Sequence, residues 1–81
     1  MKATVYVTLK QEVLDPQGEA VRRALGSLGF AGVRSVRVGK LIEIESEGDD
    51  AGAFSERLQG MAADLLANPV IEDFRVEVQD S

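Results

Sequence analysis

The 81-residue chain contains no cysteine, no histidine and no tryptophan. Without cysteine it can form neither disulfides nor thiolate metal sites. Without histidine it lacks the commonest metal ligand and the usual acid–base group near neutral pH. A nucleophile of the common kind also needs histidine or an equivalent base beside it. The serines and threonines are therefore interpreted as surface and turn residues, and no catalytic residue is predicted.

Long apolar runs and excess positive charge are missing as well. No stretch of 18 apolar residues exists that could span a membrane. Fourteen acids against nine bases give a formal charge of −5, which disfavours nucleic-acid binding. The first residues, Met1 to Val7, alternate like a strand and lack a signal-peptide core. We therefore predict a cytoplasmic protein with no nucleic-acid or membrane partner.

The length predicts a single domain over residues 1–81 with a small core. A chain of this size buries only about 60–65% of its unfolded surface. Small domains often gain stability from disulfides, metals or oligomerisation, and cysteine and histidine are absent here. We therefore predict a homodimer or a higher homo-oligomer; the sequence does not distinguish a dimer from a tetramer.

The first half of the chain predicts a strand followed by a helix. Apolar and polar residues alternate from Ala3 to Lys10, which is typical of a strand with one buried face. Asp15 suits a helix N-cap, and Pro16 suits the first helical position. An apolar stripe and a helix-ending glycine follow: Val21, Ala24, Leu25, Leu28 and Gly29.

The segment from Val33 to Ser46 is predicted as strand, in one of two forms. Its apolar residues with even numbers are Val36, Val38, Ile42 and Ile44. A two-residue hairpin at Gly39-Lys40 would place the last two on the wrong face of the sheet. The segment is therefore either one long strand that bends at Gly39 or a hairpin with a three-residue loop. We favour the long bent strand, which could pair with another subunit.

The second half predicts a polar turn, a helix and a final strand. The turn is Glu47 to Asp50, whose acids favour a helix N-terminus. The helix carries an apolar stripe: Phe54, Leu58, Met61, Ala62 and Leu65. Asn68-Pro69 ends it, because the residue before proline avoids helical geometry. Alternation from Phe74 to Gln79 predicts the last strand.

These elements predict an α+β two-layer sandwich in the order β-α-β-(β)-α-β. The sheet is expected to be mainly antiparallel, with two helices on one face, ferredoxin-like in style. The short loops leave little room for a large pocket.

Charged clusters are weak candidates for a site. Glu43 with Glu45 is expected to face solvent, and Asp49 with Asp50 is expected to begin a helix, so no metal site is predicted. The glycines after the first helix are spaced too widely for a phosphate loop. Four bases could form a small basic patch that marks a binding surface: Lys10, Arg34, Arg37 and Lys40.

Several segments together resemble the small PurS-type subunit of phosphoribosylformylglycinamidine (FGAM) synthase over essentially the whole chain. They are Val5 to Lys10, Val13 to Gly18, Leu28 to Phe30, Val36 to Lys40 and Leu65 to Phe74. The resemblance implies a non-catalytic subunit that bridges a glutaminase and an ATP-dependent synthetase and supports ammonia transfer. It implies no cofactor in this chain, with ATP and Mg²⁺ used by the synthetase subunit. Homo-oligomers are also implied.

On that resemblance we predict a partner-facing rim. Its residues are Lys10, Asp15, Gly18, Arg37, Gly39, Lys40, Asn68, Pro69 and Glu72. One alternative is a dimeric regulatory module that senses a metabolite. Another is an acylphosphatase-like hydrolase, which the loop from Lys10 to Asp15 disfavours because it holds no arginine.

Overall fold

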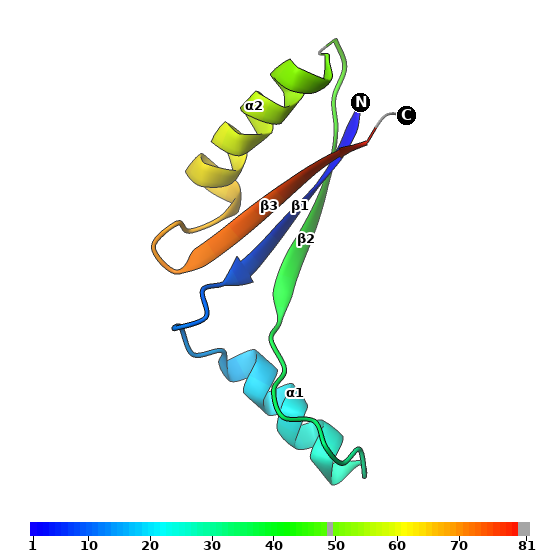
Figure 1. Cartoon of the computed structure of the whole chain (residues 1–81), viewed down its shortest axis with the longest axis vertical. Coiled ribbons are helices and arrows are strands. Elements are labelled where there is room, and N and C mark those ends of the chain that lie inside the picture. Colours follow the sequence, from blue (N-terminus) through cyan, green and yellow to red (C-terminus); the bar gives the residue numbers. More distant parts are fainter. Residues whose placement is uncertain (49, 80–81) are drawn as a thin grey trace.

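Three antiparallel strands form the sheet of the computed structural model, which describes residues 1–48 and 50–79 (Figure 1). The elements in chain order are β1 (Lys2–Leu9), α1 (Pro16–Ser27), β2 (Gly39–Glu45), α2 (Ala51–Met61), the π-helical turn η1 (Ala62–Leu66) and β3 (Glu72–Gln79). β1 lies in the centre of the sheet, between β2 and β3. The α+β class and the antiparallel sheet with two helices agree with the prediction.

The core lies between the sheet and α2. The alternating face of β1 is buried as predicted, with Ala3, Val5 and Val7 at most 2% exposed. Phe54 and Leu58 of α2 pack on this face and are fully buried. The opposite face carries polar and charged side chains, including the exposed Glu43 of β2. One helix therefore supplies the second layer over most of the sheet.

The segment 33–46 is shorter as a strand than predicted. β2 covers only Gly39–Glu45 and pairs with β1, while residues 33–38 lead into it without regular structure. The hairpin alternative is wrong, because the chain does not turn back at Gly39-Lys40, and within the described residues no fourth strand forms. Ile42 and Ile44 then share the core face of one uninterrupted strand, so neither lies on the wrong face of the sheet as the two-residue hairpin would require.

The position of α1 differs from the prediction. Both helices were expected to cover one face, but within residues 1–48 and 50–79 only α2 does so. α1 extends beyond the end of the sheet (Figure 1). Its apolar stripe remains open, with Val21 41% and Leu28 73% exposed. The radius of gyration is 16.1 Å, against about 12 Å for a compact chain of this length. The chain is therefore elongated, because α1 extends past the two layers that the sheet and α2 form.

Helix ends follow the predicted chemistry. Asp50 caps α2 by accepting a hydrogen bond from the N–H of Ala53 at 2.8 Å. Gly29, with φ at 95°, ends α1, and the N–H of Phe30 donates to the carbonyl of Leu25. Asp49, predicted to begin α2 together with Asp50, lies outside the described residues.

The end of the second helix departs from the predicted stripe. In η1 the N–H of Ala67 donates to the carbonyl of Ala62, a five-residue step that adds one residue to the turn. The register shifts by one position, so that Leu66 packs against the core and Leu65 is 82% exposed. The prediction that Leu65 belongs to the buried stripe is therefore wrong.

Candidate partner interface

The predicted rim residues gather at one end of the sheet. Because the strands are antiparallel, the end of β1 lies beside the starts of β2 and β3. This edge holds Lys10 after β1, Gly39 and Lys40 at the start of β2, and Glu72 at the start of β3. Asp15 and Gly18 begin α1, Arg37 precedes β2, and Asn68 and Pro69 precede β3. The structure thus brings together residues that are far apart in the sequence.

Asp15 is the most enclosed polar residue of this edge. Its side chain accepts hydrogen bonds from the N–H of Gly18 at 2.9 Å and from the N–H of Val38 at 2.7 Å. The residue is 8% exposed. These two N–H groups, that of Val38 first, hold the pKa of the Asp15 carboxyl below its ordinary value. The carboxylate therefore joins the start of α1 to the segment before β2.

Gly18 and Gly39 are required by close packing. A methyl group at Gly18 would lie 2.0 Å from the carbonyl oxygen of Val36, and one at Gly39 would lie 2.7 Å from that of Val7. Both distances are shorter than a van der Waals contact, so only glycine fits without a shift of the backbone. Gly18 is buried and its structural role is evident.

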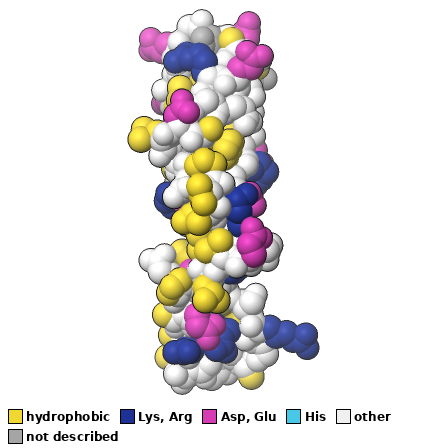
Figure 2. Space-filling model, turned by 90° about the vertical axis from the view of Figure 1, so that its left-hand side faces the viewer, with side chains coloured by type: hydrophobic (Ala, Val, Ile, Leu, Met, Phe, Trp, Pro, Cys, Tyr) yellow, Lys and Arg dark blue, Asp and Glu magenta, His cyan; other side chains and the backbone are white. Residues whose placement is uncertain are grey.

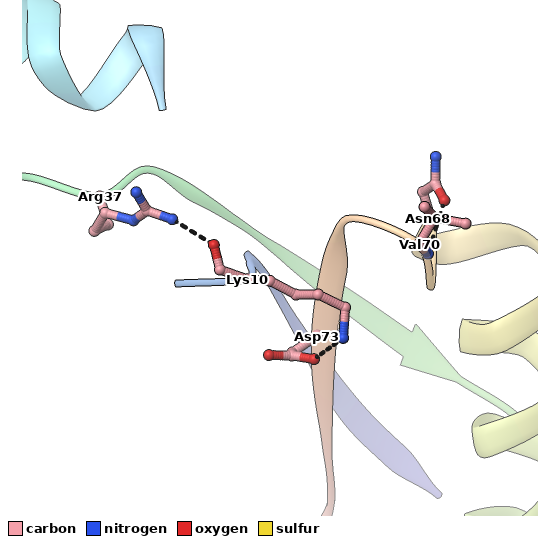
Figure 3. Close-up of polar contacts among 5 residues, drawn as sticks. All are labelled: Lys10, Arg37, Asn68, Val70 and Asp73. Carbon is pink, nitrogen blue, oxygen red and sulfur yellow. Dashed lines mark hydrogen bonds and ion pairs between the residues drawn. The ribbon is translucent and has the colours of Figure 1, made fainter. Parts of the chain in front are cut away.

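The basic residues of the edge already have partners. Lys10 forms an ion pair with Asp73 at 2.9 Å, and Arg37 donates to the carbonyl of Lys10 at 2.9 Å (Figure 3). The hydrogen bond and the charge of Asp73 raise the pKa of Lys10. Nζ of Lys40 lies 3.9 Å from Oε2 of Glu72 and donates to the carbonyl oxygen of Leu66 at 3.4 Å. Three members of the predicted basic patch, Lys10, Arg37 and Lys40, thus lie in a network that also holds the acids Asp73 and Glu72.

Asn68 organises the turn that precedes β3. Its side-chain oxygen accepts from the N–H of Val70 at 3.1 Å (Figure 3), and its N–H donates to Glu72 at 2.7 Å. Its carbonyl also accepts from the N–H groups of Ile71 and Glu72. This arrangement explains why an asparagine suits the position, since its side chain stabilises a turn.

Two surface hollows lie at opposite ends of the sheet. A hollow of about 200 Å³ adjoins Asp15, Val38, Gly39, Lys40 and Glu72, below the roughly 300–1,000 Å³ of most ligand pockets. A polar hollow of about 400 Å³ lies at the opposite end of the sheet, beside Lys2, Glu43 and Glu45. Across residues 1–48 and 50–79, no cluster of three or more acids has the arrangement of a metal site. None of the helices there has the length and apolarity to cross a membrane.

Exposed apolar residues are the part of this surface that the sequence analysis missed. Leu14, Leu65 and Val70 are 88%, 82% and 78% exposed. Hydrophobic side chains form a stripe along the face shown in Figure 2, from the level of α2 down to that of α1. Apolar residues in the turns around Leu14 and Val70 were the available signal, because turns of monomeric domains are usually polar.

The chain is similar to known PurS proteins over almost its whole length. The family model described as PurS, phosphoribosylformylglycinamidine (FGAM) synthase, matches residues 2–80. The PurS subunit of Methanocaldococcus jannaschii is 44% identical over 96% of this chain and 94% of that protein. The PurS subunit of Bacillus subtilis is 47% identical over 98% of this chain and 93% of that protein.

Solved structures give the same similarity. The crystal structure of Methanocaldococcus jannaschii PurS, a subunit of an amidotransferase in the purine biosynthetic pathway, superposes with a TM-score of 0.90 and 41% identity, covering 99% of this chain and 96% of that one. A chain in the PurLQS structure from Thermotoga maritima superposes with a TM-score of 0.85 and 32% identity, covering 94% and 93% of the two chains.

Proposed function

The chain belongs to the PurS family, whose members are subunits of phosphoribosylformylglycinamidine synthase in purine biosynthesis, and we propose that it is the non-catalytic assembly subunit of that enzyme. In this role it bridges the glutaminase and the ATP-dependent synthetase subunits and supports the transfer of ammonia between them. The absence of histidine and cysteine from the sequence favours this role over a catalytic one. ATP and Mg²⁺ belong to the synthetase subunit, and the complex acts in the cytoplasm.

The observation that carries the proposal is the open surface of the single chain. Its accessible surface is 5826 Å², against about 4,700 Å² for a compact monomer of 8.7 kDa. The surplus of about 1,100 Å² exceeds the roughly 800 Å² that one partner contributes to a standard interface. This exposed surface includes the apolar stripe of α1. We expect the chain to bury part of it against other subunits.

We also propose that α1 contributes to a homodimer or a higher homo-oligomer. Val21 of α1 and Leu28 at its C-terminal end are exposed, and within residues 1–48 and 50–79 the sheet does not cover this helix. Full burial of an exposed Val or Leu side chain stabilises by about 1.5–3 kcal/mol, and Leu28, at 73% exposed, can gain more of this than Val21, at 41%. A second copy is an available source of matching apolar surface, as two-fold contacts are self-complementary.

Reconstitution of the three-subunit enzyme tests the assembly role. We expect glutamine-dependent amidine formation only when this chain, the synthetase and the glutaminase are all present. Free ammonium supplied at high concentration should restore synthesis by the synthetase without this chain, because it bypasses transfer from the glutaminase. Full glutamine-dependent activity without this chain would refute the bridging role.

The mixed-charge network at the edge of the sheet gives a prediction about the interface. Replacing Arg37 and Lys40 together by alanine should raise the dissociation constant of the complex by about threefold to tenfold, equivalent to at most about 1.4 kcal/mol. The fold should persist, because such exposed contacts contribute only about 0–1 kcal/mol each to stability. A binding titration measures the affinity, and thermal unfolding monitors the fold.

The matched control is Arg34→Ala, which removes an exposed arginine from the same segment before β2. An unchanged affinity for the double variant, or an equal loss for the control, would exclude this network from the interface.

A further inference from the structure

The direction of α1 relative to the sheet depends on very few contacts. Gly18 is the buried residue of this helix, and its apolar stripe does not reach the core of the chain. Two connecting segments, 10–15 and 28–38, join α1 to β1 and β2. Whatever sets the direction of the helix must therefore act where these segments meet.

Asp15 lies at that meeting point and contacts both segments. Oδ1 accepts from Gly18 in the first turn of α1, whereas Oδ2 accepts from Val38, one residue before β2. The carbonyl oxygen of Val36 packs closely over Gly18, and Arg37 donates to the carbonyl of Lys10. The carboxylate of Asp15 thus hydrogen-bonds both to the start of α1 and to the residue before β2.

We propose that Asp15 is a positioning residue that fixes the angle between α1 and the sheet. Oδ1 caps the helix by accepting from Gly18, and Oδ2 links segment 10–15 to segment 28–38 by accepting from Val38. Bonds to a carboxylate are about twice as strong as neutral ones, which makes this joint stiff. The inference rests on the proposed function in one respect: α1 is held so that its exposed apolar face meets other subunits at a defined angle.

Asp50 is a matched control for the cap without the joint. It occupies the N-cap of α2 and accepts from the N–H of Ala53 in its own helix. The direction of α2 is set separately, by the packing of Phe54 and Leu58 against the sheet. Asparagine caps helices about as well as aspartate does. Asp50→Asn should therefore change neither the helix nor its direction.

Asp15→Asn keeps the helix cap but removes the hydrogen bond that Val38 donates to Asp15. The amide oxygen can still accept from the N–H of Gly18, but the amide NH₂ would then face the N–H of Val38, two donors without an acceptor. We expect α1 to remain helical and its angle to the sheet to become variable. The expected accompanying loss of affinity for the synthetase and glutaminase is about tenfold to a hundredfold, the size of one lost hydrogen bond to a charged group.

The angle can be measured by spin-label distances, because the chain has no native cysteine. Cysteines introduced at the exposed positions Ser27, at the far end of α1, and Glu56, on α2, carry the two labels. Dilution with unlabelled chain keeps the measured distance within one molecule. We expect a single narrow distance distribution in the parent chain and in Asp50→Asn, and a distribution at least twice as wide in Asp15→Asn.

Backbone chemical shifts of α1 separate positioning from capping. Retained helical shifts with a broadened distance would support the proposal. An unchanged distance in Asp15→Asn would overturn it, as would loss of helical shifts in α1, which would reduce Asp15 to a cap. A broadened distance with full glutamine-dependent activity would support positioning by Asp15 and contradict the use of α1 in the assembly.

Discussion

Phe54→Ala is expected to lower the free energy of unfolding by about 3–5 kcal/mol, the usual cost of removing a buried aromatic ring. Phe54 is fully buried between α2 and the sheet and is among the largest buried side chains of the chain. A domain has about 5–15 kcal/mol of stability in total, so this single change removes a large part of it. Urea denaturation at a fixed protein concentration measures the loss, since oligomerisation adds to apparent stability.

Leu65→Ala is the matched control for this experiment. By helical periodicity Leu65 follows Phe54, Leu58 and Ala62 on one stripe, yet the π turn of η1 leaves it 82% exposed. Its replacement should change the free energy of unfolding of the single chain by no more than about 0.5 kcal/mol. A loss as large as that of Phe54→Ala that does not change with protein concentration would show that the register shift in η1 is not present in solution.

Gly18→Ala is expected to destabilise the chain by about 1–3 kcal/mol, as overpacking of a close contact does. The added methyl group would lie 2.0 Å from the carbonyl oxygen of Val36, so that the start of α1 and the segment before β2 must separate. The same displacement would strain the hydrogen bond between Asp15 and Val38. Thermal unfolding measures the loss, and amide exchange at Val38 should rise with it.

Gly26→Ala in the same helix should act in the opposite direction. A methyl group there has no neighbour within 4 Å. Alanine is favoured over glycine inside a helix by about 0.5–1 kcal/mol, so the variant should be slightly more stable. Equal destabilisation by both substitutions would mean that α1 tolerates no added methyl group at all, and would contradict the specific role of Gly18.

Local structure followed closely from the sequence. Alternation in β1 predicted its buried face, Asp15 and Asp50 predicted the two helix starts, and Gly29 predicted a helix end. These rules work because caps and periodicity involve groups within about one turn or one strand pleat of each other. The resemblance of the chain to PurS subunits was also visible in the sequence, and family membership is confirmed.

Non-local contacts decided the rest. The sequence showed an apolar stripe on α1 but not what would cover it, because a stripe is equally suited to its own sheet or to another subunit. The one-residue shift in η1 could not be read from periodicity, which assumes a regular helix. Whether the bases were free also depended on distant acids: Lys10 is paired with Asp73, 63 residues further along the chain.

The sequence by itself determined the order of the strands and helices that form, the buried face of β1 and the family. Only the tertiary structure decided that α1 extends away from the sheet and that the predicted rim residues meet at one edge. The reason is physical: propensities and caps are settled by near neighbours, whereas the angle of α1 depends on Asp15 meeting Val38 and Gly18 meeting Val36. Such contacts exist only once distant segments have come together.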